Sequence, residues 1–117
     1  MLKFLDVACG WLLLLGAILH SYGTLASYPI GSEIQVWSFS GSLAAALIAV
    51  LNLVRTKRPQ DGTLAWITFA SSLAWAAIAL GFGSAIGRIF DPRVLWHLIA
   101  ALVLAAFSLK YALAARR

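Results

Sequence analysis

The chain has 117 residues, of which 62% are hydrophobic and only 11% are charged. Its mean hydropathy is +0.92. Soluble domains average roughly 45–50% apolar and about 25% charged residues, so this composition excludes a soluble protein. A helical membrane span needs roughly 20 apolar residues. The chain therefore has room for four spans with short connections, and for no soluble domain beside them.

The formal net charge is +5. In a soluble protein such a charge would suggest a nucleic-acid partner. Here the basic residues lie at the ends of apolar segments, where they indicate orientation in a membrane. We therefore expect no binding to nucleic acid. The single cysteine, Cys9, cannot form a disulfide within the chain and says nothing about the redox compartment.

Four apolar segments predict four helical spans, at about residues 4–26, 32–54, 63–85 and 92–114, in a single domain of residues 1–117. The first follows Lys3 and is interpreted as a retained helix and not a cleaved signal peptide, because three similar segments follow it. Turn residues and prolines separate the segments. The sequence predicts an all-α, polytopic four-helix transmembrane bundle with up-down-up-down topology.

Capping patterns mark where the later helices begin. Ser32 with Gln35 three residues on is typical of a capping box before the second span. Asp61 or Thr63 can cap the third. Asp91 followed by proline predicts an N-cap with proline in the first helical position of the fourth.

The distribution of lysine and arginine predicts the orientation. With four spans, the two termini and the middle loop share one side of the membrane, which carries seven basic residues against two on the other side. Such an excess in short loops is typical of the cytoplasmic side. We therefore expect both termini in the cytoplasm, in a bacterial-type cytoplasmic (inner) membrane. The seven are Lys3, Arg55, Lys57, Arg58, Lys110, Arg116 and Arg117, and the two are Arg88 and Arg93.

Two further features concern partners. The basic loop residues Arg55, Lys57 and Arg58 are predicted to contact anionic lipid headgroups. Small residues at four-residue spacing allow membrane helices to approach closely. We expect these strips to pack inside the bundle, and a homo-oligomer is the alternative for one of them. They comprise Gly41, Ala45 and Ala49, then Ala77, Gly81 and Ala85, with Gly83 and Gly87 as a GxxxG pair.

The two histidines are the main candidates for a site. His20 lies one to two turns below the outer end of the first span, and His97 lies a similar distance below the start of the fourth. Ionisable residues inside a membrane are functional candidates. The sequence predicts an outer-leaflet ligand-binding pocket between the first, second and fourth helices, lined by His20, Trp37, Arg93 and His97.

Three interpretations of the histidines stay open. Each ring is neutral and hydrogen-bonded within the bundle, or the pair provides the axial ligands of a b-type haem, or Glu33 joins them as a two-histidine, one-carboxylate metal site. Glu33 also has a structural explanation, because the first turn of a helix favours an anion. The sequence does not identify a cofactor.

Several functional classes lack their residues. No CxxC motif or histidine box is present, and no serine or cysteine nucleophile has a convincing base. The chain is similar in size to small multidrug resistance transporters, but Leu12 to Leu15 occupy the place of that family's membrane glutamate. We therefore expect a non-enzymatic binding or accessory protein, alone or in a larger membrane complex. The alternatives are a haem- or metal-binding redox protein and a small oligomeric transporter or channel.

Overall fold

A computed structural model describes residues 1–116 and contains four helices joined by short turns. They are α1 (Leu2–Ser27), α2 (Glu33–Lys57), α3 (Gly62–Ala85) and α4 (Pro92–Ala114). All four are long and apolar enough to cross a membrane. The prediction of an all-α four-helix up-down bundle is confirmed.

Side-chain caps fix where α2 and α3 begin. The Ser32 hydroxyl accepts from the Gln35 amide at 3.3 Å, and the Gln35 side chain accepts in return from the Gly31 backbone N–H at 2.8 Å. The capping box is thus present, with its return bond one residue earlier than the usual partner. At the start of α3, the Asp61 carboxylate accepts from the Leu64 N–H at 2.9 Å.

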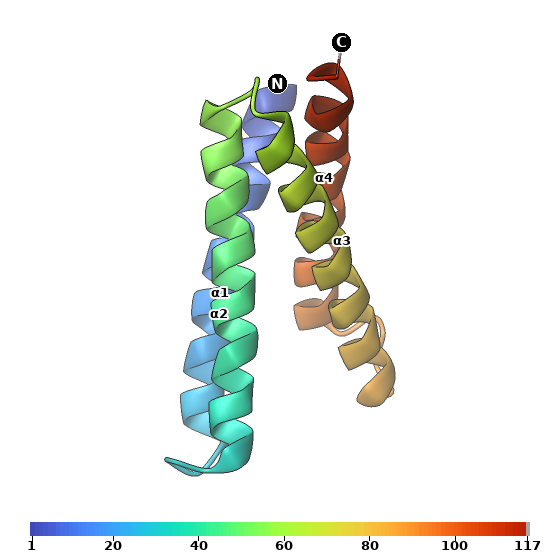
Figure 1. The fold of residues 1–117 in the computed structure, drawn as a ribbon. Coiled ribbons are helices and arrows are strands. Elements are labelled where there is room, and N and C mark those ends of the chain that lie inside the picture. Colours follow the sequence, from blue (N-terminus) through green and yellow to red (C-terminus); the bar gives the residue numbers. More distant parts are fainter. Residues whose placement is uncertain (117) are drawn as a thin grey trace.

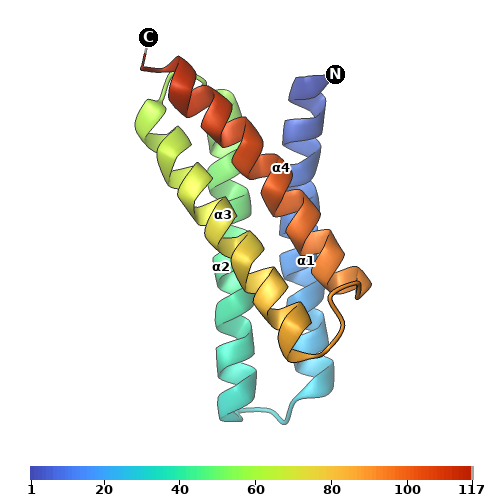
Figure 2. The ribbon, with the colours of Figure 1, turned by 90° about the vertical axis from the view of Figure 1, so that its right-hand side faces the viewer.

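The helices form two hairpins, α1–α2 and α3–α4, which lie against each other (Figures 1 and 2). Both termini and the α2–α3 connection lie at one end of the bundle, here called the terminal end. The α1–α2 and α3–α4 turns lie toward the other end, here called the turn end. The hairpins lie closest together at the terminal end and diverge toward the turn end (Figure 1).

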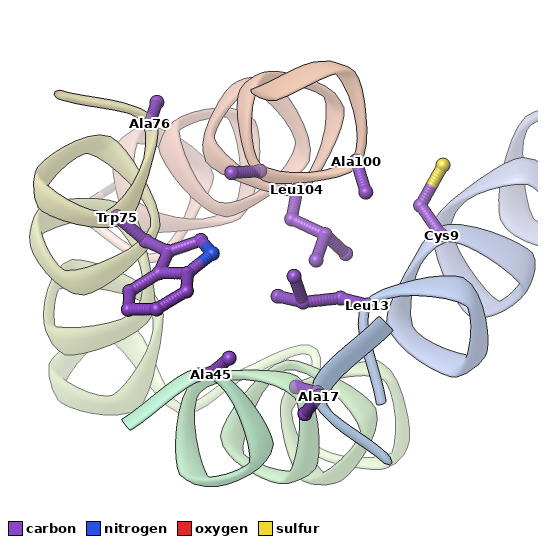
Figure 3. Packing of buried hydrophobic residues seen from close by; sticks show 10 residues of the cluster. Cys9, Leu13, Ala17, Ala45, Trp75, Ala76, Ala100 and Leu104 are labelled. Carbon is purple, nitrogen blue, oxygen red and sulfur yellow. The ribbon is translucent and has the colours of Figure 1, made fainter. Parts of the chain in front are cut away.

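The core consists mainly of small side chains. Ala49, Ala101 and the larger Leu13 and Leu104 are completely buried, and Trp75 fills the space between the helices at 9% exposure (Figure 3). Many large apolar side chains face outward instead. Because lipid provides no hydrophobic drive for helix association, small residues at the contacts and large ones toward the hydrocarbon suit a membrane bundle.

The small-residue strips do not all serve this core. Ala45 and Ala49 of α2 are buried in it, whereas Ala77, Gly81 and Ala85 of α3 are exposed. The expectation that the α3 strip packs inside the bundle is therefore wrong. The helical rotation places Ala76 and Ala79 in the interior instead. Ala77, Gly81 and Ala85 consequently face outward.

Glycine is required at Gly83 and not at Gly81. A methyl group at Gly83 would lie 3.0 Å from Val94 Cγ1 and 3.2 Å from Ile89 Cα, whereas one at Gly81 would meet nothing within 4 Å. Gly83 therefore allows the close approach of α3 to the beginning of α4.

We predict that Gly83→Ala destabilises the protein by about 1–3 kcal/mol, because the backbone at Ile89 must move. The matched variant Gly81→Ala should leave stability unchanged or raise it by up to about 1 kcal/mol, since alanine has the higher helix propensity. Unfolding in detergent micelles measures both. Equal effects of the two variants would contradict the α3–α4 packing described here.

Candidate functional site

The most deeply buried charges form an ion pair between α1 and α2. Arg55 donates from Nη2 to Asp6 Oδ1 at 2.6 Å and from Nη1 to Asp6 Oδ2 at 3.0 Å. The side chains are 0% and 1% exposed, respectively. Two parallel bonds between a guanidinium and a carboxylate combine strength with a fixed orientation.

Asn52 extends this pair to the other hairpin. Its amide donates to the Ser72 hydroxyl of α3 at 2.9 Å, and its Oδ1 accepts from the Ser108 hydroxyl of α4 at 3.0 Å. The same Oδ1 also accepts from Arg55 Nη2 at 3.2 Å. One polar network, called the terminal network below, therefore joins all four helices. Its members are Asp6, Asn52, Arg55, Ser72 and Ser108.

Arg55 does not lie where the sequence analysis placed it. Its guanidinium is buried in the terminal network and stands 5.3 Å from the centroid of the Tyr111 ring. The prediction that Arg55 contacts lipid headgroups is thus corrected. Lys57 and Arg58 are exposed at the same end of the bundle, and for them headgroup contact stays a prediction.

Asp6 is the residue that the sequence analysis missed. It lies inside an apolar segment, and an unpaired carboxylate there would be costly in a membrane. Arg55 is the first basic residue after the second apolar segment, in the last turn of α2 and at the same end of the bundle. The pair could therefore have been predicted from the sequence, because a carboxylate within a membrane span needs a cation as its partner.

His20 is hydrogen-bonded within the first hairpin. Its Nε2 lies 3.2 Å from the Ser38 carbonyl oxygen and 3.3 Å from the Ser38 hydroxyl. The residues of α1 one turn away on either side, Gly16 and Thr24, are buried, and so is Leu13. His20 itself is exposed. His20 is thus exposed, although the residues one turn before it and one turn after it on the same face of α1 are buried.

His97 is held by the other helices. Its Nδ1 accepts from Trp75 Nε1 of α3 at 3.1 Å, and a methyl group at Gly16 of α1 would lie 3.1 Å from both His97 Cε1 and Nε2. The ring of His97 therefore packs against α1 at Gly16. Gly16 lies four residues before His20, a distance of about 6 Å along the helix axis. The two imidazoles share one face of α1, one turn apart.

The structure does not bring the other two predicted pocket residues to this face. Trp37 is 69% exposed on α2. The Arg93 side chain is 73% exposed and bonds to Asp91 through Nε and Nη2, each at 2.9 Å. Hydrogen bonds from the Arg93 side chain and backbone N–H lower the pKa of Asp91 to about 2. Asp91 is the predicted cap of α4, and Arg93 supports that cap.

The geometry does not fit a haem between the histidines. An axial ligand needs a free nitrogen lone pair, but His97 Nδ1 is occupied by Trp75, and His97 Nε2 faces the backbone at Gly16 without room for a porphyrin. Glu33 is exposed in the first turn of α2. Among residues 1–116, no three His, Cys, Asp or Glu side chains are grouped so that they could hold a metal ion.

The structure has two shallow hollows whose linings include none of the four predicted pocket residues. One, of about 270 Å³, lies between α1 and α2 and is lined by Ser21, Phe39 and Ser42 among others. The other, of about 420 Å³, lies at the α3–α4 turn, around Arg88 and Phe90. Neither is lined by a histidine.

Comparison of the chain with protein families, with curated proteins and with solved structures finds no match. The geometry of the chain itself therefore carries the functional interpretation. Two features stand out in this geometry. One is the terminal network, in which every side chain is hydrogen-bonded to another, and the other is the exposed imidazole of His20.

We predict that Asp6→Leu and Arg55→Met each destabilise the protein by about 3–5 kcal/mol, because each leaves an unpaired buried charge. The double variant should recover most of that loss, since apolar side chains can replace a buried ion pair. Reversible unfolding in micelles provides the double-mutant cycle. Lys57→Met, an exposed control on the same helix, should change stability by less than about 0.5 kcal/mol. Additive effects of the two single variants would contradict the pairing.

Proposed function

We propose that this chain is a small multi-pass protein of a bacterial-type cytoplasmic membrane, with both termini in the cytoplasm. It acts without catalysis, as a binding or accessory protein. Its site lies in the outer leaflet at His20, on the face of α1 that also contacts His97. The bound species is an amphiphile that enters sideways from the bilayer.

The outer surface and its charges support the membrane part of this proposal. Phe4, Trp11 and Ile99 are 76%, 58% and 58% exposed, which suits lipid and not water. Exposed lysines and arginines gather at the terminal end, as expected for the cytoplasmic side. They are Lys3, Lys57, Arg58, Lys110 and Arg116.

The main observation that supports a binding site is the exposure of His20. Counted from Ser27, the end of α1, it lies about 10 Å into the helix. A polar ring exposed to hydrocarbon is unfavourable unless a partner satisfies it. The other helices leave His20 uncovered on this face of α1. A membrane amphiphile can supply the polar partner that the ring needs.

The terminal network favours binding over transport. Asp6, Asn52 and Arg55 fill the bundle axis at 0–1% exposure, and their polar atoms are bonded to one another or to Ser72 and Ser108. A water path along the axis of one bundle would have to break this network. A ligand that enters from the side at the turn end would not disturb it.

Native mass spectrometry of the protein extracted in a mild detergent tests the proposal. We expect one retained amphiphile per chain, and we expect His20→Phe to lose it because the polar atoms of the ring are gone. Trp11→Phe should retain it, since Trp11 is exposed on α1 more than two helical turns from His20. A wild-type chain without a retained molecule would contradict the proposal, and so would a His20→Phe chain that retains it equally.

A further inference from the structure

The hydrogen bonds around His20 determine which of its nitrogens carries the proton. Thr24 Oγ1 donates to the His20 carbonyl oxygen at 2.9 Å, which uses the only proton of that hydroxyl. The Ser38 hydroxyl, 2.6 Å from Thr24 Oγ1, must then be the donor of that pair. Ser38 has no second hydroxyl proton to give to His20.

His20 Nε2 is therefore a donor. Both of its neighbours, the Ser38 carbonyl and the Ser38 hydroxyl oxygen, can only accept from it. In the neutral imidazole the other nitrogen, Nδ1, then carries a bare lone pair. Within residues 1–116, Nδ1 of His20 has no hydrogen-bond partner, and the ring is exposed.

His97 shows the opposite situation. Trp75 Nε1 donates to its Nδ1, so the proton of the neutral His97 ring lies on Nε2, at the surface of α1. The acceptor of His97 is thus already used inside the bundle. Of the two imidazoles, only that of His20 offers a free acceptor.

We infer that the His20 site selects an amphiphile that carries a hydroxyl group, and that the hydroxyl donates to His20 Nδ1. This inference rests on the proposed function and adds the ligand class to it. An ether or ester oxygen has no proton for the Nδ1 lone pair, and a carboxylate or phosphate would be repelled by it. A lipid alcohol supplies both the donor and the apolar chain that the bilayer-facing position requires.

Two kinds of lipid share this chemistry, a long-chain alcohol and a diacylglycerol. The probes are therefore hexadecanol with its methyl ether, and dioleoylglycerol with its acetate ester, each added to phosphatidylcholine nanodiscs that hold the full chain. Nitrogen NMR of protein labelled in its histidine rings reports on Nδ1 and Nε2 separately.

At neutral pH we expect at least one of the two alcohols to shift the His20 Nδ1 resonance saturably. Its capped counterpart should bind about tenfold more weakly, the effect of one hydrogen bond. The alcohol that binds identifies the source of the hydroxyl. His97 Nδ1 should not respond in the same way, because Trp75 occupies it.

Ser38→Ala serves as the matched variant. It removes the hydroxyl but leaves the carbonyl that fixes the Nε2 proton, so alcohol binding should persist. His20→Phe, tested with the same probes by native mass spectrometry, should abolish the preference for the alcohol. If that variant does not fold, the comparison of each alcohol with its capped counterpart on the wild type still tests whether the hydroxyl is selected.

Equal binding of an alcohol and its capped counterpart at His20 would overturn the ligand class and leave the proposed binding function standing. A neutral His20 ring with its proton on Nδ1 would overturn the class as well. No response of His20 to any of the four probes would overturn the inference, and a chain that also retains no amphiphile on extraction would overturn the proposed function at this site.

Discussion

The buried pair of Asp6 and Arg55 is the interaction on which the rest of the structure depends. Two opposite charges with almost no exposure are stable in an apolar bundle only while each satisfies the other. Asn52 then carries the network from α2 to Ser72 and Ser108, so the register of both hairpins is fixed at the terminal end. Small core residues alone would allow several packings with similar contacts. The network favours one of them.

Toward the turn end the polar contacts are mostly confined to one hairpin. His20, Ser38 and Thr24 form a chain within α1–α2, and Trp75 with His97 forms a contact within α3–α4. The indole N–H of Trp96 donates to the Leu12 carbonyl at 2.8 Å and links α4 to α1. The hairpins diverge in this region (Figure 1). The open position at His20 thus follows from an architecture that is joined tightly at one end.

The sequence predicted the helices and their caps well, because hydropathy, proline and capping residues act locally. It placed His20 and His97 on neighbouring helices, and the structure brings both rings to one face of α1. Trp37 and Arg93 were predicted to line the same pocket, but Trp37 is exposed and Arg93 is bonded to Asp91, because hydropathy and spacing do not fix how a helix is rotated about its axis. Asp6 and Arg55 are 49 residues apart, and a basic residue at the end of a span is interpreted first as an orientation signal. Only the tertiary packing turns it inward.

Every role assigned here depends on the four helices spanning a membrane with the terminal end inside. The sidedness of single-cysteine variants in intact cells tests this most directly. Cys9 is buried and can be replaced by alanine to give a cysteine-free background. A membrane-impermeant maleimide should label Ile30→Cys in intact cells and label Gln60→Cys only after the membrane is opened. Both positions are exposed, in the α1–α2 and α2–α3 connections respectively. Labelling of Gln60→Cys from outside, with Ile30→Cys protected, would contradict the orientation and place His20 in the inner leaflet.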